Sequence, residues 1–455
     1  MARSFGRYLS LEMVILCLIE LILSFMLIYA MLVAAAMPEE ARFGGSVFFW
    51  VRPESANLAA MLAFAIGATS VTIGLYRPTM YLQRRRFLIY AAVATLLAFP
   101  VTLAVSETLK IQLSHSYLLW VAKVLLSWAG CILISRWVFA LAVRHKVFVR
   151  TVLVLGRGPR ADRLTGVIRR QQGRLFELAG QLDPAQLCGL GPLSHQKIWG
   201  LVIAAGRMER LPIEQLLACK LRGVQVLEDV SFWERHLGRI DLANADPNWL
   251  LFADGFSSGP VADAVRRAVD IAISLLFLIF TLPLMVVVGL SIKFDSPGPI
   301  FYRQERIGLH GRVFTLMKFR SMCTDAEAGG TPRWASHNDP RVTRVGAFIR
   351  STRIDELPQL LNVLRGEMSF IGPRPERPLF VEELRRVIPL YSDRTWVKPG
   401  ITGWAQVNFP YGASVEDARE KLSYDLYYVK NRSLLLDLLI LISTIRVILF
   451  REGAR

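Results

Sequence analysis

Residues 268–292 read AVDIAISLLFLIFTLPLMVVVGLSI, an apolar run that decides how the second half of the chain meets a membrane. Pro283 lies near its middle, where the proline ring removes a helix hydrogen bond and bends the chain. Basic residues lie on both sides of the run: Arg266 and Arg267 before it, and Lys293, Arg303 and Arg306 after it. A straight span would carry the second basic group across the membrane. We therefore expect the helix to enter one leaflet, bend at Pro283 and return to the same side; a kinked spanning helix is the alternative.

The composition of the whole chain is that of a membrane protein. Its 455 residues are 53% hydrophobic and 20% charged, with a mean hydropathy of +0.38, which excludes a disordered scaffold, a small disulfide-rich secreted protein and an ordinary soluble enzyme. The net charge of +17 favours orientation in a membrane and attraction to anionic lipids or substrates. Since no zinc-finger spacing or RNA-recognition signature accompanies this charge, we expect membrane lipids as partners and no nucleic acid.

Four further apolar stretches fill the first third of the chain, and each is long enough to cross a bilayer core of roughly 30 Å. They cover 11–36, 56–76, 87–108 and 116–143. Basic residues precede the first stretch, separate the second from the third and follow the fourth. By the positive-inside rule, both ends of this bundle, over 1–147, are expected on the cytoplasmic side.

Residues 148–262 alternate short apolar strand runs with helical stretches, which predicts a parallel α/β domain. The strands are expected at 152–155, 201–204 and 224–227. After the first strand, Gly156 and Gly158 begin a GxGxxA turn that is similar to a dinucleotide-binding loop. Pro159 and two arginines crowd the loop, so we favour a Rossmann-like domain with a structural or regulatory role over a cofactor-binding one.

The pair Asp355-Glu356 is the candidate reactive centre. It opens an expected amphipathic helix with apolar residues at 357, 360, 361 and 364 and with Pro358 in its first turn. The helix dipole favours ionised carboxylates there, and such a pair suits a nucleophile that faces a phosphoanhydride with a divalent metal between them. An ordinary helix cap is the alternative. The helix-cap alternative is disfavoured by the nearby arginines Arg350 and Arg353 and by the Gly-Pro-Arg-Pro loop at 372–375, because Arg in rigid loops binds phosphate bidentately.

Four short motifs occur in order in this region: KFRSM at 318–322, DELPQLLNVLRGEMS at 355–369, GPRPE at 372–376 and KPGITGWAQV at 398–407. Together they resemble the catalytic domain of the bacterial polyprenyl-phosphate hexose-1-phosphate transferases, the monotopic phosphoglycosyl transferases that start exopolysaccharide, O-antigen and capsule assembly. The resemblance covers about 266–450, and the order of the elements before it is similar to the large members. Residues 411–421 resemble the exosortase-associated exopolysaccharide branch.

The resemblance implies a ping-pong reaction. Asp355 attacks the β-phosphate of a UDP-sugar, releases UMP and keeps the sugar phosphate, which undecaprenyl phosphate then takes. Mg²⁺, with Mn²⁺ as the alternative, is expected at Asp355 and Glu356. Five basic residues are expected to bind phosphate: Lys318, Arg320, Arg341, Arg353 and Arg374. The resemblance further implies the bacterial inner membrane with the catalytic domain on its cytoplasmic face, allows a homodimer, and makes glucose the default sugar, with galactose the rival.

The predicted architecture is therefore a membrane helical bundle, a Rossmann-like α/β domain, and a re-entrant membrane helix with a small α+β catalytic domain over 263–455. The last apolar stretch, 434–450, contains Asp437 and Arg446 and is expected to be packed or interfacial, since a span would bury both charges in lipid. Two other functions remain open. A membrane-tethered nucleotide-sugar dehydratase or epimerase would need Tyr-x-x-x-Lys, which none of the twelve tyrosines provides. A non-enzymatic membrane nucleotide sensor would not depend on Asp355.

Overall fold

The computed structural model describes residues 11–36, 53–73, 75–76, 84–108, 117–144, 149–170, 176–184, 186, 198–204, 211–242, 256, 259–324, 339–409 and 414–450. The chain forms two compact units, Met1–Arg235 and His236–Arg455, and each is described by itself.

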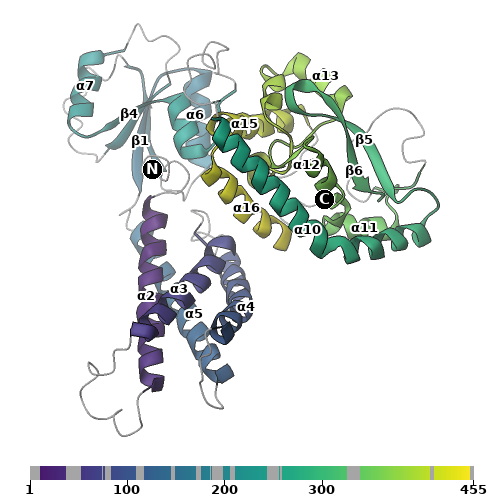
Figure 1. Cartoon of the computed structure of the whole chain (residues 1–455). Helices are drawn as coiled ribbons and strands as arrows, with labels where there is room; N and C mark the ends of the chain where they lie inside the picture. Colours follow the sequence, from purple (N-terminus) through teal and green to yellow (C-terminus); the bar gives the residue numbers. More distant parts are fainter. Residues whose placement is uncertain are drawn as a thin grey trace. The chain divides into compact units, whose positions relative to one another are not determined.

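The first unit begins with four long apolar helices (Figure 1). These are α2 (Leu11–Ala36), α3 (Pro53–Ile73), α4 (Arg84–Thr108) and α5 (Tyr117–Arg144). Each is long and apolar enough to cross a membrane, so the four predicted membrane helices are confirmed as helices. Large apolar side chains such as Ile22, Phe64 and Leu96 are exposed on them, which is typical of a surface that faces lipid.

A buried carboxylate ties three parts of this bundle together. Glu20 of α2 accepts hydrogen bonds from the Tyr76 hydroxyl at 2.7 Å and from the Ser135 hydroxyl of α5 at 2.5 Å. Its second partner on α5 is Arg136, whose Nε lies 3.2 Å from Oε1 of Glu20. Because an unpaired charge at this depth is costly, these contacts favour a single packing of the helices.

A parallel four-stranded sheet follows the helices. Its strands are β1 (Arg150–Leu155), β2 (Phe176–Leu182), β3 (Ile198–Ile203) and β4 (Gln225–Glu228), in the order β2-β1-β3-β4. They are accompanied by α6 (Pro159–Arg170), α7 (Ile213–Leu221), α8 (Asp229–Phe232) and η6 (Trp233–Leu237). The three predicted strands are confirmed, and with them the parallel α/β sheet; the Rossmann assignment stays a prediction.

Strand β2 was not expected, because its side chains are only partly buried and its pattern is weak. Asp183 directly follows it and forms an ion pair with Arg157 of the glycine turn, with 3.3 Å between Arg157 Nε and Asp183 Oδ2. Arg160 likewise pairs with the buried Asp229, its Nη2 lying 2.6 Å from Oδ1. The two arginines that crowd the glycine turn are thus engaged with acidic residues at the carboxyl ends of the strands.

The second unit begins with α10 (Pro260–Asp295), a single helix of 36 residues that contains Pro283. The remaining elements are β5 (Phe301–Ile307), η7 (Leu309–Gly311), β6 (Val313–Phe319), α11 (Arg344–Ser351), η8 (Ile354–Glu356), α12 (Gln359–Arg365), β7 (Ser369–Ile371), α13 (Pro378–Val387), η9 (Tyr391–Trp396), β8 (Gly400–Thr402), α14 (Trp404–Asn408), α15 (Val415–Asn431) and α16 (Leu434–Leu449). Strands β5 and β6 form an antiparallel hairpin, whereas β7 and β8 pair in parallel.

Helix α10 stays helical through Pro283, so the chain is not broken at this residue; Figure 1 shows its ribbon bending along its length. Its first half is anchored by polar groups. Arg266 Nε donates to Asp437 of α16 at 2.8 Å, and Arg267 donates to the carbonyl oxygen of Val363 at 2.6 Å, at the end of α12. Asp270 accepts a 2.8 Å hydrogen bond from the backbone N–H of Phe370.

The second half of α10 is anchored by apolar packing. Met285, Val288 and Ile292 form one core with Phe319 of β6 and Ile349 of α11. Between the two anchored parts, large side chains such as Ile279 and Phe280 are exposed at 70% and 75%. An apolar surface of this kind is typical of contact with lipid.

Helix α16 packs inside the unit. Its Asp437 and Arg446 are both buried, at 8% and 1% exposed, and Asp437 accepts a hydrogen bond from the Tyr428 hydroxyl at 2.8 Å. The helix contacts α14, β7 and β8. Protein groups therefore surround both charges, and of the two arrangements expected from the sequence, packed or interfacial, the helix has the packed one.

We predict that Arg266→Met lowers the free energy of unfolding by about 3 kcal/mol, because it leaves the carboxylate of Asp437 buried without its cation. The measurement is thermal unfolding of the full chain in detergent. Arg386→Met, which removes an exposed cation of α13 that pairs with Glu382, is the control and should change the Tm little. Equal Tm values for the two variants would show that the Arg266–Asp437 pair does not anchor α10.

Candidate active site

A tight turn presents the two carboxylates. Helix α11 ends at Ser351, Arg353 adopts a left-handed conformation with φ 60°, and Asp355 and Glu356 then lie in the short 3₁₀ turn η8. Helix α12 begins only at Gln359, with Pro358 at its N-cap. The expectation that the pair opens the amphipathic helix is thus corrected, since the pair lies in a separate turn before it. A seven-residue helix has little dipole to offer, so the charges of neighbouring side chains decide the ionisation of the pair.

Three cations surround one oxygen of Glu356. Its Oε1 lies 2.8 Å from Nη2 of Arg374, 3.3 Å from Nζ of Lys318 and 3.6 Å from Nη1 of Arg353. Burial raises the pKa of Glu356, but Arg374, Lys318 and Arg353 outweigh burial and hold the pKa well below its usual range. Glu356 is therefore ionised and holds the three cations in one place.

Asp355 has the opposite electrostatics. Burial, followed by the negative charge of Glu356, raises its pKa, while Lys318 and Arg353 act in the other direction. Only 8% of the residue is exposed, and its Oδ1 is buried without a hydrogen-bond partner among the residues that the structure describes. An unsatisfied buried carboxylate oxygen with a perturbed pKa makes Asp355 a candidate for a functional role.

Of the five basic residues expected to bind phosphate, Lys318, Arg353 and Arg374 meet at the carboxylates. Arg320 instead donates to the carbonyl oxygens of Ser296 at 2.7 Å and Pro297 at 2.8 Å, in the turn after α10. That turn needs Gly298, whose φ is +121° and whose added Cβ would lie 2.1 Å from Arg320 Nη1.

Arg341 forms an ion pair with an acidic neighbour. It makes a double contact with Asp339, at 2.8 Å from Nε to Oδ1 and 2.6 Å from Nη2 to Oδ2. The role of Arg320 and Arg341 in phosphate binding stays a prediction.

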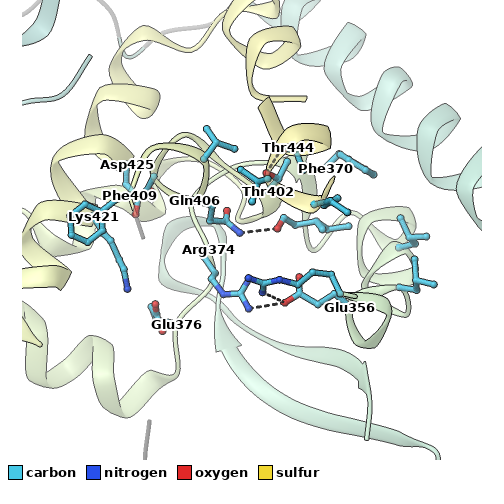
Figure 2. Close-up of a pocket in the computed structure, with 18 of the residues that line it drawn as sticks. Glu356, Phe370, Arg374, Glu376, Thr402, Gln406, Phe409, Lys421, Asp425 and Thr444 are labelled. Atoms are coloured by element: carbon cyan, nitrogen blue, oxygen red, sulfur yellow. Dashed lines mark hydrogen bonds and ion pairs between the residues drawn. The ribbon is translucent and has the colours of Figure 1, made fainter. Parts of the chain in front are cut away.

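A cavity of about 240 Å³ is lined by Glu356, the neighbour of Asp355 in the pair (Figure 2). One part is cationic and carries Arg353 and Arg374; another is apolar, between α10, α12 and α16; a third is polar and mixed in charge. The apolar part is lined by Phe277, Leu357, Leu360, Phe370, Val447 and Ile448, and the polar part by Glu376, Arg394, Gln406, Lys421 and Asp425.

The sequence motifs predicted no role for the residues of the polar part, although Glu376 belongs to the GPRPE motif. Gln406, Lys421 and Asp425 come from α14 and α15, which lie far from the carboxylates in sequence. The clearest available signal was Asp425, a carboxylate on a helix face that is otherwise buried. Its Oδ2 pairs with Nη2 of Arg394 at 2.8 Å.

The carboxylates also fit a divalent cation. The described residues contain no group of three or more His, Cys, Asp or Glu side chains that could bind a metal alone. Mg²⁺ is commonly held by one or two carboxylates together with substrate phosphates. Asp355, with its unpartnered Oδ1, and Glu356 match that pattern, provided that a phosphate-bearing substrate completes the ligands.

Comparison with known proteins identifies the family of this chain. A family model described as bacterial sugar transferase matches residues 261–451, the part of the chain that contains α10 and the carboxylate pair. The exopolysaccharide production protein PSS of Rhizobium leguminosarum bv. phaseoli is 42% identical over 190 residues, which cover 40% of this chain and 93% of that protein. The chain belongs to the bacterial sugar transferase family.

Two longer matches extend beyond this part. The UDP-N-acetylgalactosamine-undecaprenyl-phosphate N-acetylgalactosaminephosphotransferase of Aeromonas hydrophila is 43% identical over 251 residues, covering 55% of this chain and 57% of that protein. The undecaprenyl-phosphate glucose phosphotransferase of Komagataeibacter xylinus is 34% identical over 321 residues, covering 67% of this chain and 60% of that protein. The chain thus spans less than two thirds of these two relatives.

Proposed function

We propose that the protein transfers a hexose 1-phosphate from a UDP-sugar to undecaprenyl phosphate through a covalent phosphosugar intermediate on Asp355. One observation carries the proposal: Oδ1 of Asp355 is buried without a partner beside three cations that Glu356 holds together. A nucleophile for a diphosphate needs these two features, an available oxygen and a fixed positive field.

In the first step, a carboxylate oxygen of Asp355 forms a bond to the β-phosphorus of the donor. The bond from that phosphorus to the bridging oxygen breaks, and its electron pair leaves with UMP. Arg374, Lys318 and Arg353 neutralise the phosphate charge as it shifts to the leaving group. Mg²⁺, or Mn²⁺, held by Asp355 and Glu356 would add further neutralisation of the diphosphate when bound.

In the second step, a phosphate oxygen of undecaprenyl phosphate attacks the phosphorus of the acyl phosphate, and the carboxylate of Asp355 is restored. The apolar part of the cavity supports this acceptor. Phe277 of α10, Phe370 and Ile448 of α16 line a path from the lipid-facing helices to the cationic part. An isoprenoid chain suits such a wall, and its phosphate suits the cations.

The contacts of α10 support entry into one leaflet. Asp270 and Met285 both contact the catalytic unit, and Met285 is 15 positions beyond Asp270. Fifteen helical residues span about 22 Å, which is less than the roughly 30 Å of a hydrocarbon core. Both contacts therefore belong on one side of the bilayer, which we take to be the cytoplasmic face of the bacterial inner membrane.

The transferred sugar is proposed to be glucose, in exopolysaccharide assembly of the exosortase-associated kind. The named relatives divide between glucose and N-acetylgalactosamine, so the donor requires direct measurement. Release of UMP from UDP-glucose, UDP-galactose and the UDP-N-acetylhexosamines, in the presence of undecaprenyl phosphate and Mg²⁺, would identify it.

We predict that Asp355→Asn reduces UMP release at least about a thousandfold, because an amide cannot form the acyl phosphate. After incubation with a UDP-sugar that is radiolabelled in its sugar, the same variant should carry no covalently bound label. Asp393→Asn, which removes a partly buried carboxylate outside the cavity lining, is the matched control. Turnover by Asp355→Asn at the control rate would exclude Asp355 as the nucleophile.

We predict a pH dependence set by Asp355. Attack requires the carboxylate, and because burial raises its pKa, the acidic limb of kcat/KM should lie above the ordinary range of an aspartate. Lys318→Met removes a positive charge that lowers this pKa, so the limb should move to higher pH. Arg312→Met, on the exposed hairpin turn, should leave the limb unchanged. An unmoved limb in Lys318→Met would contradict this electrostatic role.

We predict that both ends of α10 are accessible from the same side of the membrane. In a background without the five native cysteines, single cysteines at Val261 and Phe294, exposed at 75% and 89%, should react only with a reagent on the cytoplasmic side. A cysteine at position 39, which the charge pattern puts outside, is the control. Labelling of position 294 from outside would mean that α10 spans the membrane.

A further inference from the structure

The polar end of the cavity takes no part in the reaction just described. Figure 2 shows Glu376 and Lys421 on the opposite side of Arg374 from Glu356. Gln406 lines the same cavity from α14. Each of these three side chains can make hydrogen bonds to a ligand, and together they provide acceptors and a donor.

Glu376 is held at a fixed place relative to the phosphate-binding Arg374. The loop that carries both is clamped: Arg394 donates to the Arg374 carbonyl oxygen at 2.8 Å, and the N–H of Ile307 donates to the Glu376 carbonyl oxygen at 3.0 Å. Two residues of chain span at most about 7 Å. The backbone positions of Arg374 and Glu376 are therefore within about 7 Å of each other, and both side chains line one cavity.

The side chain of Gln406 offers a hydrogen-bond acceptor to a ligand. Its Nε2 donates to the carbonyl oxygen of Ile401 at 2.9 Å, which orients the side chain. Its Oε1 is buried and accepts no hydrogen bond from the residues that the structure describes. A hydroxyl group of a ligand could donate a hydrogen bond to this oxygen and so provide the missing partner.

The mixed charges of this end favour a polar, uncharged ligand. Glu376 and Asp425 balance Arg394 and Lys421, so this end has no excess positive charge for a phosphate, and an apolar group would leave these charges desolvated without hydrogen bonds. Asp425 pairs with Arg394 at 2.8 Å, and Oε2 of Glu376 lies 3.7 Å from Nη1 of Arg306. Glu376 and Lys421 both line the cavity, where a carboxylate and an ammonium suit a neutral polar ligand. Vicinal hydroxyls, which both donate and accept, match a carboxylate beside an ammonium.

We propose that Glu376, Gln406 and Lys421 form a hydroxyl-binding subsite for a sugar ring of the nucleotide donor. This inference rests on the proposed function, since it takes the ligand to be a UDP-sugar. The donor has two such rings, the hexose and the ribose, and they share the chemistry that the subsite recognises.

The test measures UMP release by the full chain in membranes with UDP-glucose and UDP-galactose, and inhibition by UMP. Glu376→Gln and Lys421→Met should each lower kcat/KM about tenfold or more, through KM. If the ring is the hexose, the ratio of kcat/KM between the two donors changes and the inhibition constant of UMP does not. If the ring is the ribose, the inhibition constant of UMP rises and the ratio is preserved.

Two charged residues outside the cavity lining provide controls. Glu382→Gln on α13 and Arg419→Met on α15 remove the same charges outside the cavity lining and should leave all constants unchanged. Lys421→Arg keeps the positive charge and should keep part of the affinity for the donor. Thermal unfolding of each variant shows whether a loss of affinity is instead a loss of folding. The inference is overturned if Glu376→Gln and Lys421→Met keep KM and UMP inhibition within twofold of the parent, even where kcat falls. Absence of UMP release from the parent with any UDP-sugar would instead refute the proposed function.

Discussion

The catalytic unit depends on one buried carboxylate with more positive charge around it than it can neutralise. Glu356 brings Lys318 from β6, Arg353 from the turn before η8 and Arg374 from the GPRPE loop to a single oxygen. Three cations would repel one another without it, and a buried carboxylate would be too costly without them. The remaining positive charge suits a diphosphate, so the same interaction stabilises the fold locally and prepares the site.

This cluster is supported by the way in which α10 meets the rest of the unit. Arg267 caps the end of α12, the helix that follows the carboxylate turn, and Asp270 accepts from the backbone of Phe370, which lines the cavity. The lipid-facing helix and the reactive turn are therefore connected by buried hydrogen bonds.

Local patterns predicted a good part of this protein. Apolar runs of bilayer length predicted α2 to α5, and strand runs predicted β1, β3 and β4. The short motifs pointed to Asp355, Glu356 and three cations that do meet. Strand β2 was missed because partial burial leaves no clear alternation, and the carboxylate pair was assigned to a helix because a 3₁₀ turn and a helix start share the same residue types.

The sequence by itself determined which residues could do chemistry, because residue type decides charge, hydrogen bonding and apolar length. Only the tertiary structure decided which of them act together. Arg320 and Arg341 are the same residue type as Arg374, yet one holds the turn after α10 and the other pairs with Asp339. Likewise Gln406 and Lys421 join Glu376 only through the packing of α14 and α15. Long-range packing decides which of these side chains lie close to one another, and no local pattern in the chain encodes that proximity.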